Sequence, residues 1–126
     1  MKKSEICDLV LAKVSEVCEV NKESIIQGVK LQSVVDARVL AVQYLRRIGL
    51  SADDIAHHLL MRQNLGQEPT LAEIKKKRKG IEKAFDMYSR RCLDSYAFCL
   101  MSQEIKEYCK EKYENFYLSW MKEPPR

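Results

Sequence analysis

The sequence predicts an all-α fold, and three observations lead to this prediction. Its 126 residues include only 4 glycines and 3 prolines, so few turns can be built and long helices are expected. Apolar residues recur at helical spacing along most of the chain, and no segment shows the alternation of a strand. Residues that favour helix caps precede several periodic segments. One cooperative domain fits this length, with 46% apolar residues to fill its core.

The N-terminal segment is expected to form two helices. The first runs from about Ser4 to Val20, and its apolar stripe consists of Ile6, Leu9, Val10, Val14 and Val17. Asn21 is then expected to cap a short helix, KESIIQ, that stops at Gly28.

The next segment predicts the clearest helix of the chain. It contains VVDARVLAVQYLRRI, and Ser33 and Asp36 are spaced as a capping box at its start. Gly49 supplies a left-handed residue at its end. The buried stripe of this helix is expected to consist of Val34, Ala37, Ala41, Leu45 and Ile48.

Two further capping boxes mark the helices that follow. Ser51 and Asp54 open a fourth helix, and after a break through RQNLGQEP, Thr70 and Glu73 open a fifth. The apolar positions expected for this fifth helix are Ile74, Ile81, Phe85, Tyr88, Cys92, Tyr96 and Cys99.

The last third of the chain is aromatic and helical in pattern. Eight of the ten aromatic residues lie between Tyr88 and Trp120. The segment forms one long helix or two, with Ser102 as the single candidate for a break. We expect residues 92–121 to form a helical extension that packs on the rest or mediates oligomerisation, and residues 122–126, KEPPR, to form a frayed tail.

Five consecutive basic residues, Lys75 to Lys79, lie in the first turns of the expected fifth helix. Residues 70–91 hold eight basic and three acidic side chains, a net charge of +5. The apolar stripe must pass through position 77 or 78, where both residues are charged, so the first two turns are expected to project beyond the core. Clustered positive charge near a helix N-terminus becomes favourable when phosphate binds there. We interpret the run as a polyanion-binding surface; a solvated helix face and a targeting signal are the alternatives.

The segment VCEVNKESIIQGVKLQSVVDARVLAVQYLRRIGLSADDIAHHL resembles the C-terminal DNA-binding domain of the bacterial replication initiator DnaA, whose fold is related to the Trp repressor. The similarity covers residues 6 to about 85, and VVDARVLAVQYLRRI and LSADDIA carry most of it. It implies that residues 1–91 form a helical DNA-binding domain with a helix–turn–helix. Arg38 stands where that family carries an arginine that contacts bases from the minor groove.

The chain departs from this family where the recognition helix opens. The family's GGRDHSTV-like segment is replaced by MRQNLGQEPTLAEI, in which only Thr70 is similar, and the connection is several residues longer. The phosphate-binding motif of the family's ATPase module is also absent, so no nucleotide is expected to bind. Phosphate contacts from basic residues do not require the missing segment.

We therefore predict a non-catalytic protein that binds double-stranded DNA through Lys30, Gln32, Arg38, Thr70, Lys75, Lys76, Arg78 and Lys79. No catalytic residue, metal or cofactor is predicted; His57 and His58, adjacent on a helix, point about 100° apart and share a metal poorly. The alternative is a helical protein-interaction module that uses the aromatic C-terminal helices. A third option is RNA binding by the same basic residues.

The cysteines and the hydropathy indicate a cytoplasmic protein without a membrane segment. Five cysteines without a CxxC pair argue against a disulfide framework, so buried reduced thiols are expected. No apolar run approaches the roughly 18 residues that a membrane-spanning helix needs. The N-terminus has the pattern of an amphipathic helix and not of a signal peptide.

Overall fold

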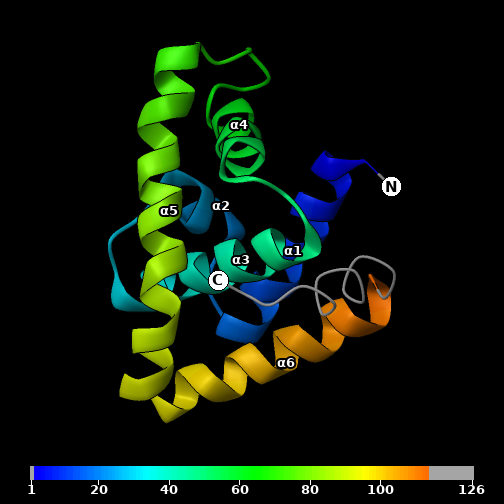
Figure 1. Cartoon of the computed structure of the whole chain (residues 1–126), viewed down its shortest axis with the longest axis vertical. Helices are drawn as coiled ribbons and strands as arrows, with labels where there is room; N and C mark the ends of the chain where they lie inside the picture. Colours follow the sequence, from blue (N-terminus) through cyan, green and yellow to red (C-terminus); the bar gives the residue numbers. More distant parts are fainter. Residues whose placement is uncertain (1, 114–126) are drawn as a thin grey trace.

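The structure, a computed structural model, describes residues 2–113, which form six α-helices and no strand (Figure 1). The all-α prediction is confirmed. The predicted tail at 122–126 and the end of the predicted extension lie outside the described residues. Within them, no helix combines the length and the apolar character needed to cross a membrane. The helices are α1 (Lys3–Cys18), α2 (Lys22–Gln27), α3 (Gln32–Ile48), α4 (Ala52–Gln63), α5 (Leu71–Asp94) and α6 (Tyr96–Lys112).

Helix α3 forms the centre of the fold and contacts all five other helices. The predicted stripe of α3 is buried throughout. Burial extends well beyond one stripe, because neighbouring helices cover most of the circumference of α3. The further buried residues of this helix are Asp36, Val39, Leu40, Val42, Gln43 and Tyr44.

Side-chain caps define the starts of three helices as predicted. The Asn21 carboxamide oxygen accepts the backbone N–H of Glu23 and opens α2. Complete capping boxes open α4, between Ser51 and Asp54, and α5, between Thr70 and Glu73. Each box satisfies two backbone N–H groups that the helix itself leaves unbonded.

The capping box predicted at Ser33 and Asp36 is wrong. Helix α3 begins at Gln32, after Leu31, without a side-chain cap. The Asp36 carboxylate instead points toward α5, where Oδ1 accepts from Arg91 Nε and Oδ2 from Arg91 Nη2, each at 2.9 Å. Gln32 Nε2 also donates to Asp36 Oδ1 at 2.8 Å. This part-buried pair, with the Asp36 side chain 10% and the Arg91 side chain 22% exposed, joins the start of α3 to the end of α5.

The break between helices lies at Ser95 and not at Ser102, and the described part of the segment from Tyr96 onward is a single helix, α6. Tyr96 and Cys99, expected to continue the fifth helix, belong to α6 instead. Ser95 Oγ accepts the backbone N–H of Phe98 and caps α6. Ser102 lies inside α6 and is buried, with its hydroxyl 2.8 Å from the Tyr44 hydroxyl and also within hydrogen-bonding distance of the Tyr88 hydroxyl. The Ser102 hydroxyl therefore connects α6 to both α3 and α5. Because this serine lies inside α6 and bonds to other helices, it does not interrupt the helix.

Helix α6 belongs to the same core as the helices before it. It contacts α1, α3 and α5, and runs across the lower side of the bundle in the view of Figure 1. Phe98, Ile105 and Cys109 are fully buried against that core. The described part of the predicted extension is thus packed on the rest of the molecule.

All five cysteines are free thiols, but only two of them are fully buried. Burial raises the pKa of Cys7 and of Cys109 to about 12, so both thiols stay protonated at neutral pH. Cys18, Cys92 and Cys99 are half-buried. The expectation of buried thiols therefore holds for Cys7 and Cys109 alone.

Substitution of Asp36 tests the contribution of the Asp36–Arg91 pair to stability. Asp36→Asn should lower the free energy of unfolding by about 2 kcal/mol, because it removes a bidentate charge-assisted contact. Urea unfolding followed by circular dichroism measures the change. Asp86→Asn, at an exposed position of the same α5 helix, is the matched control and should stay within about 0.5 kcal/mol of wild type. Equal losses in the two variants would contradict the assignment.

Candidate nucleic-acid interface

Helices α4 and α5 lie in contact at one end of the molecule, joined by the connection at residues 64–70 (Figure 1). Ile74, in the first turn of α5, is partly buried against the core. Arg78 Nη1 lies 3.4 Å from the Asp53 carboxylate at the start of α4. The first two turns of α5 contain no fully buried residue, but Ile74 contacts the core and α4 covers one side of them. The prediction that they project beyond the core therefore holds only in part.

The five consecutive basic residues are distributed around α5, since each residue is rotated by about 100° from the one before it. Lys76 and Lys77 face α3 and line a groove there. Arg78 faces α4 and is engaged by Asp53 and, at 3.9 Å, by Glu82. Lys75 and Lys79 are exposed and line no part of that groove. The run therefore contributes to two separate surfaces, and Arg78 contributes mainly to the contact between α4 and α5.

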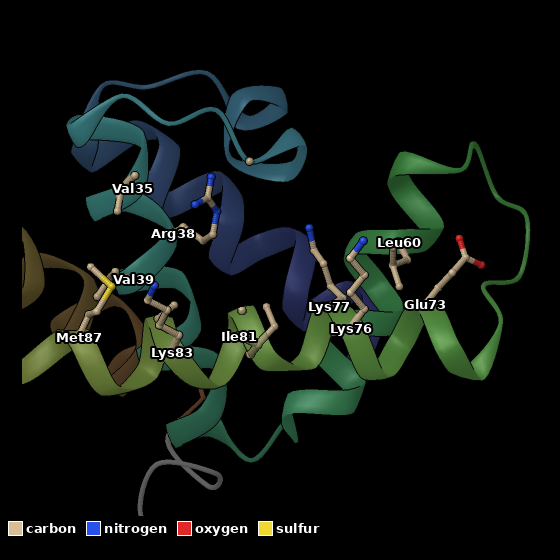
Figure 2. Close-up of a pocket in the computed structure, with 13 residues that line it drawn as sticks. Val35, Arg38, Val39, Leu60, Glu73, Lys76, Lys77, Ile81, Lys83 and Met87 are labelled. Carbon is tan, nitrogen blue, oxygen red and sulfur yellow. The ribbon is translucent and has the colours of Figure 1, made fainter.

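The α3–α5 groove, as we call it, has a volume of about 560 Å³ and lies beside the turn that joins α2 to α3 (Figure 2). Four basic side chains from two helices line it: Arg38 from α3, and Lys76, Lys77 and Lys83 from α5. Its apolar lining comes from Val35, Val39, Leu60, Ile81, Ala84 and Met87. Glu73 lies at the end of the groove nearest the α4–α5 connection (Figure 2).

The turn between α2 and α3 holds Arg38 in place. Gly28 ends α2 in a left-handed conformation, with φ of 76°, which a glycine adopts without strain. Arg38 Nη2 donates to the carbonyl oxygen of Val29 at 3.2 Å and would lie 3.6 Å from a Cβ atom placed on Gly28. Arg38 is half-buried by these contacts, and its burial lowers the pKa of the guanidinium.

Lys77 extends into the same groove as Arg38 (Figure 2). Burial lowers the pKa of Lys77, and the positive charge of Arg38 lowers it further. Within residues 2–113, neither of these cations forms an ion pair with an acidic side chain. Two like charges held together in a part-buried site without a counter-charge favour the binding of an anion.

Some basic side chains elsewhere in the described chain pair with acids. Asp8 alone accepts contacts from His58 at 3.0 Å, Arg62 at 3.5 Å and Lys22 at 3.8 Å. Further ion pairs join Lys3 to Asp54 and Lys13 to Glu16. Within the described residues, other cations such as Lys106, Lys110 and Lys112 of α6 also form no ion pair, so what distinguishes the α3–α5 groove is that cations from two helices line it together.

The remaining predicted contact residues fall into two groups. Lys30, in the α2–α3 turn, is exposed and forms no ion pair within residues 2–113. Gln32 and Thr70 have structural partners, since the Gln32 amide donates to Asp36 and the Thr70 hydroxyl accepts the N–H of Glu73. Lys30 is therefore available to a ligand. The side chains of Gln32 and Thr70 already form hydrogen bonds at the N-terminal ends of α3 and α5.

Sequence reasoning missed two residues of the groove, Lys77 and Lys83. Lys83 follows Lys76 by seven residues and so returns to the same face of the helix. That spacing could have identified Lys83. Lys77 lies where the apolar stripe of α5 would pass. Its charge indicated an interruption of the stripe, and nothing local in the sequence indicated that its side chain faces another helix.

The two histidines point to different neighbours, as their adjacency predicts. His57 Nε2 lies 3.0 Å from the Glu68 carboxylate, and His58 Nε2 lies 3.0 Å from that of Asp8. His57 is half-exposed, whereas His58 is buried.

Repulsion between the positive charges of Lys77 and Arg38 is expected to lower the free energy of unfolding of the unliganded protein. Lys77→Met keeps the length of the side chain and removes its charge, and should raise the free energy of unfolding by about 0.5 kcal/mol, a small gain because solvent screens part-exposed charges. Lys75→Met, on the outer face of α5, is the control and should leave stability unchanged.

The stability gain of Lys77→Met should vanish as the pH rises beyond the ordinary lysine pKa of 10.5, where Lys77 has lost its charge in both folded and unfolded chains. Urea unfolding at pH 7 and pH 11 measures both effects, and a destabilised Lys77→Met variant would contradict the repulsion.

Comparisons of the chain with models of protein families, with curated proteins and with solved structures gave no match. The resemblance to the DnaA C-terminal domain therefore stays a prediction from the residues quoted above.

Proposed function

We propose that this protein binds double-stranded DNA without catalysis, with α4 and α5 acting as a helix–turn–helix of the DnaA C-terminal or Trp repressor type. The observation that carries the proposal is the set of unpaired cations on two faces of one helix. Lys75 and Lys79 extend from the outer face of α5, and Lys76 lies at the rim of the α3–α5 groove. None of the three forms an ion pair within residues 2–113.

The proposed contact is mainly electrostatic. An exposed lysine without an acidic partner gains most from a phosphate, because binding releases the counterions condensed on the duplex. The N-terminal turns of α5 carry these lysines, and the major groove is wide enough to admit a helix. Lys30 in the α2–α3 turn and Arg38 on α3 beside that turn provide positive charge near α5, where the backbone of an adjacent groove would pass.

The geometry supports phosphate contacts more directly than base reading. Arg78, which we expected to contact DNA, is held by Asp53 and Glu82. Arg38 is held by the Val29 carbonyl group and is half-buried. These side chains would have to leave their partners to reach a base edge, whereas Lys75, Lys76 and Lys79 are exposed as they stand.

Salt dependence tests this proposal. Fluorescence anisotropy with a random-sequence duplex should show a slope of about −3 to −4 in a plot of log affinity against log salt, if roughly four phosphates are contacted. Changing Lys75, Lys76 and Lys79 together to Ala should weaken binding more than tenfold at about 50 mM salt and flatten the slope by about three.

The matched control changes Lys106, Lys110 and Lys112 to Ala, three exposed residues of α6, and removes the same net charge. It should retain most of the affinity and most of the slope. Equal losses of DNA affinity in the two triple variants would mean that net charge, and not the position of the lysines on α5, determines binding. A wild-type protein that does not bind the duplex at about 50 mM salt would exclude the proposal.

A protein-interaction module is the second candidate, and the corner between α5 and α6 favours it. Leu93, Tyr96 and Leu100 are large apolar residues that are 87%, 78% and 53% exposed. Apolar side chains exposed this close together are typical of contact surfaces between proteins. Sedimentation of the wild type and of a Leu93→Lys variant would detect self-association at this corner.

A further inference from the structure

The α3–α5 groove differs from a plain phosphate-binding surface because its cations stand over apolar side chains. Beyond the proposed DNA binding, we propose that this groove binds a small amphipathic anion, a molecule with a carboxylate or phosphate-monoester head and an apolar body. Duplex DNA does not fill such a site, because its backbone phosphates carry sugars and no apolar chain. The ligand chemistry follows from the lining of the groove, its size and its charge.

The size of the groove matches a small molecule. Ligand pockets typically enclose about 300–1,000 Å³ and combine an apolar lining with a few converging polar groups. The α3–α5 groove has about 560 Å³, and most of its uncharged lining is aliphatic. Val35, Val39, Ile81 and Met87 would cover an apolar body of moderate length on two sides.

The head group has a defined place. Arg38 and Lys77 approach the middle of the groove from opposite walls, one on α3 and the other on α5 (Figure 2). The hydrogen bond to Val29 uses Nη2 of Arg38, so other N–H groups of the guanidinium are left for a ligand. A carboxylate or phosphate between these two cations would relieve their repulsion and receive charge-assisted hydrogen bonds.

The orientation of the ligand follows from the two ends of the groove. Glu73 lies at the end near the α4–α5 connection and repels an anion there (Figure 2). Val39 and Met87 lie at the opposite end, beyond Arg38, where the exposed Lys83 also lines the groove (Figure 2). The head would therefore sit at Arg38 and Lys77, with the apolar body extending toward Val39 and Met87.

Titration of the full chain with decanoate, decyl phosphate and 1-decanol, followed by ¹⁵N–¹H NMR, tests this site. The three probes share an apolar body, and only the first two are anionic at neutral pH. At least one anionic probe should bind at least tenfold more tightly than decanol, and its shift changes should concentrate at Gly28, Gly80, Ile81 and Ala84. The tighter of the two anionic probes identifies the head group. Equal binding of decanol and both anions, or shift changes spread over other helices, would overturn the proposal.

Two single variants of α5 distinguish binding in the α3–α5 groove from a general effect of positive charge. Lys77→Met should weaken the preferred anionic probe about tenfold or more while decanol binding stays the same, as expected for the loss of one charge-assisted contact. Lys75→Met removes the same charge from the outer face of α5 and should bind the anionic probe like wild type. Equal weakening by the two variants would overturn the proposal. The result is independent of the duplex experiment, which uses a different ligand and a variant that retains Arg38 and Lys77.

Discussion

The burial of α3 is the constraint on which the rest of the structure depends. A helix with apolar residues on most of its circumference must be surrounded, and α1, α2, α4, α5 and α6 all contact it. The polar residues in its first two turns then acquire fixed neighbours. Asp36 meets Arg91 near the end of α5, and Arg38 meets the α2–α3 turn and the α3–α5 groove. One central helix thus places both the ion pair that anchors α5 and the cation that faces its basic residues.

Different parts of helix α5 have different roles: its middle and end hold it to the core, and its first turns carry the basic residues. Ile81 and Ala84 are buried, and Arg91 is paired, so the middle and the end of the helix hold it to the core. The basic first turns are unfavourable at a helix N-terminus, and the Thr70–Glu73 capping box and the contact with α4 stabilise them. Stability supplied elsewhere in α5 permits unpaired lysines at the end where a ligand would bind.

The candidate site could be predicted from the sequence only as a charged segment. The run from Lys75 to Lys79 and the helix that carries it follow from composition and capping, and Arg38 was identified through the resemblance to the DnaA domain. The division of the run could not be predicted, because it depends on which helices lie on each side of α5. Arg78 is engaged because Asp53 begins α4 beside it, and Lys77 is part of the groove because α3 lies opposite.

The sequence by itself determined that the chain is helical and where several helices begin, since caps, glycines and apolar spacing are local signals that act over a few residues. It predicted the starts of α2, α4 and α5 and the buried stripe of α3. Only the tertiary structure decided the roles of Asp36 and Ser102, which have local uses in isolation but bond to distant helices here. It also decided which cations remain unpaired. A side chain's partner depends on long-range packing, and a polar residue near a helix end takes the stronger or more buried contact when packing offers one.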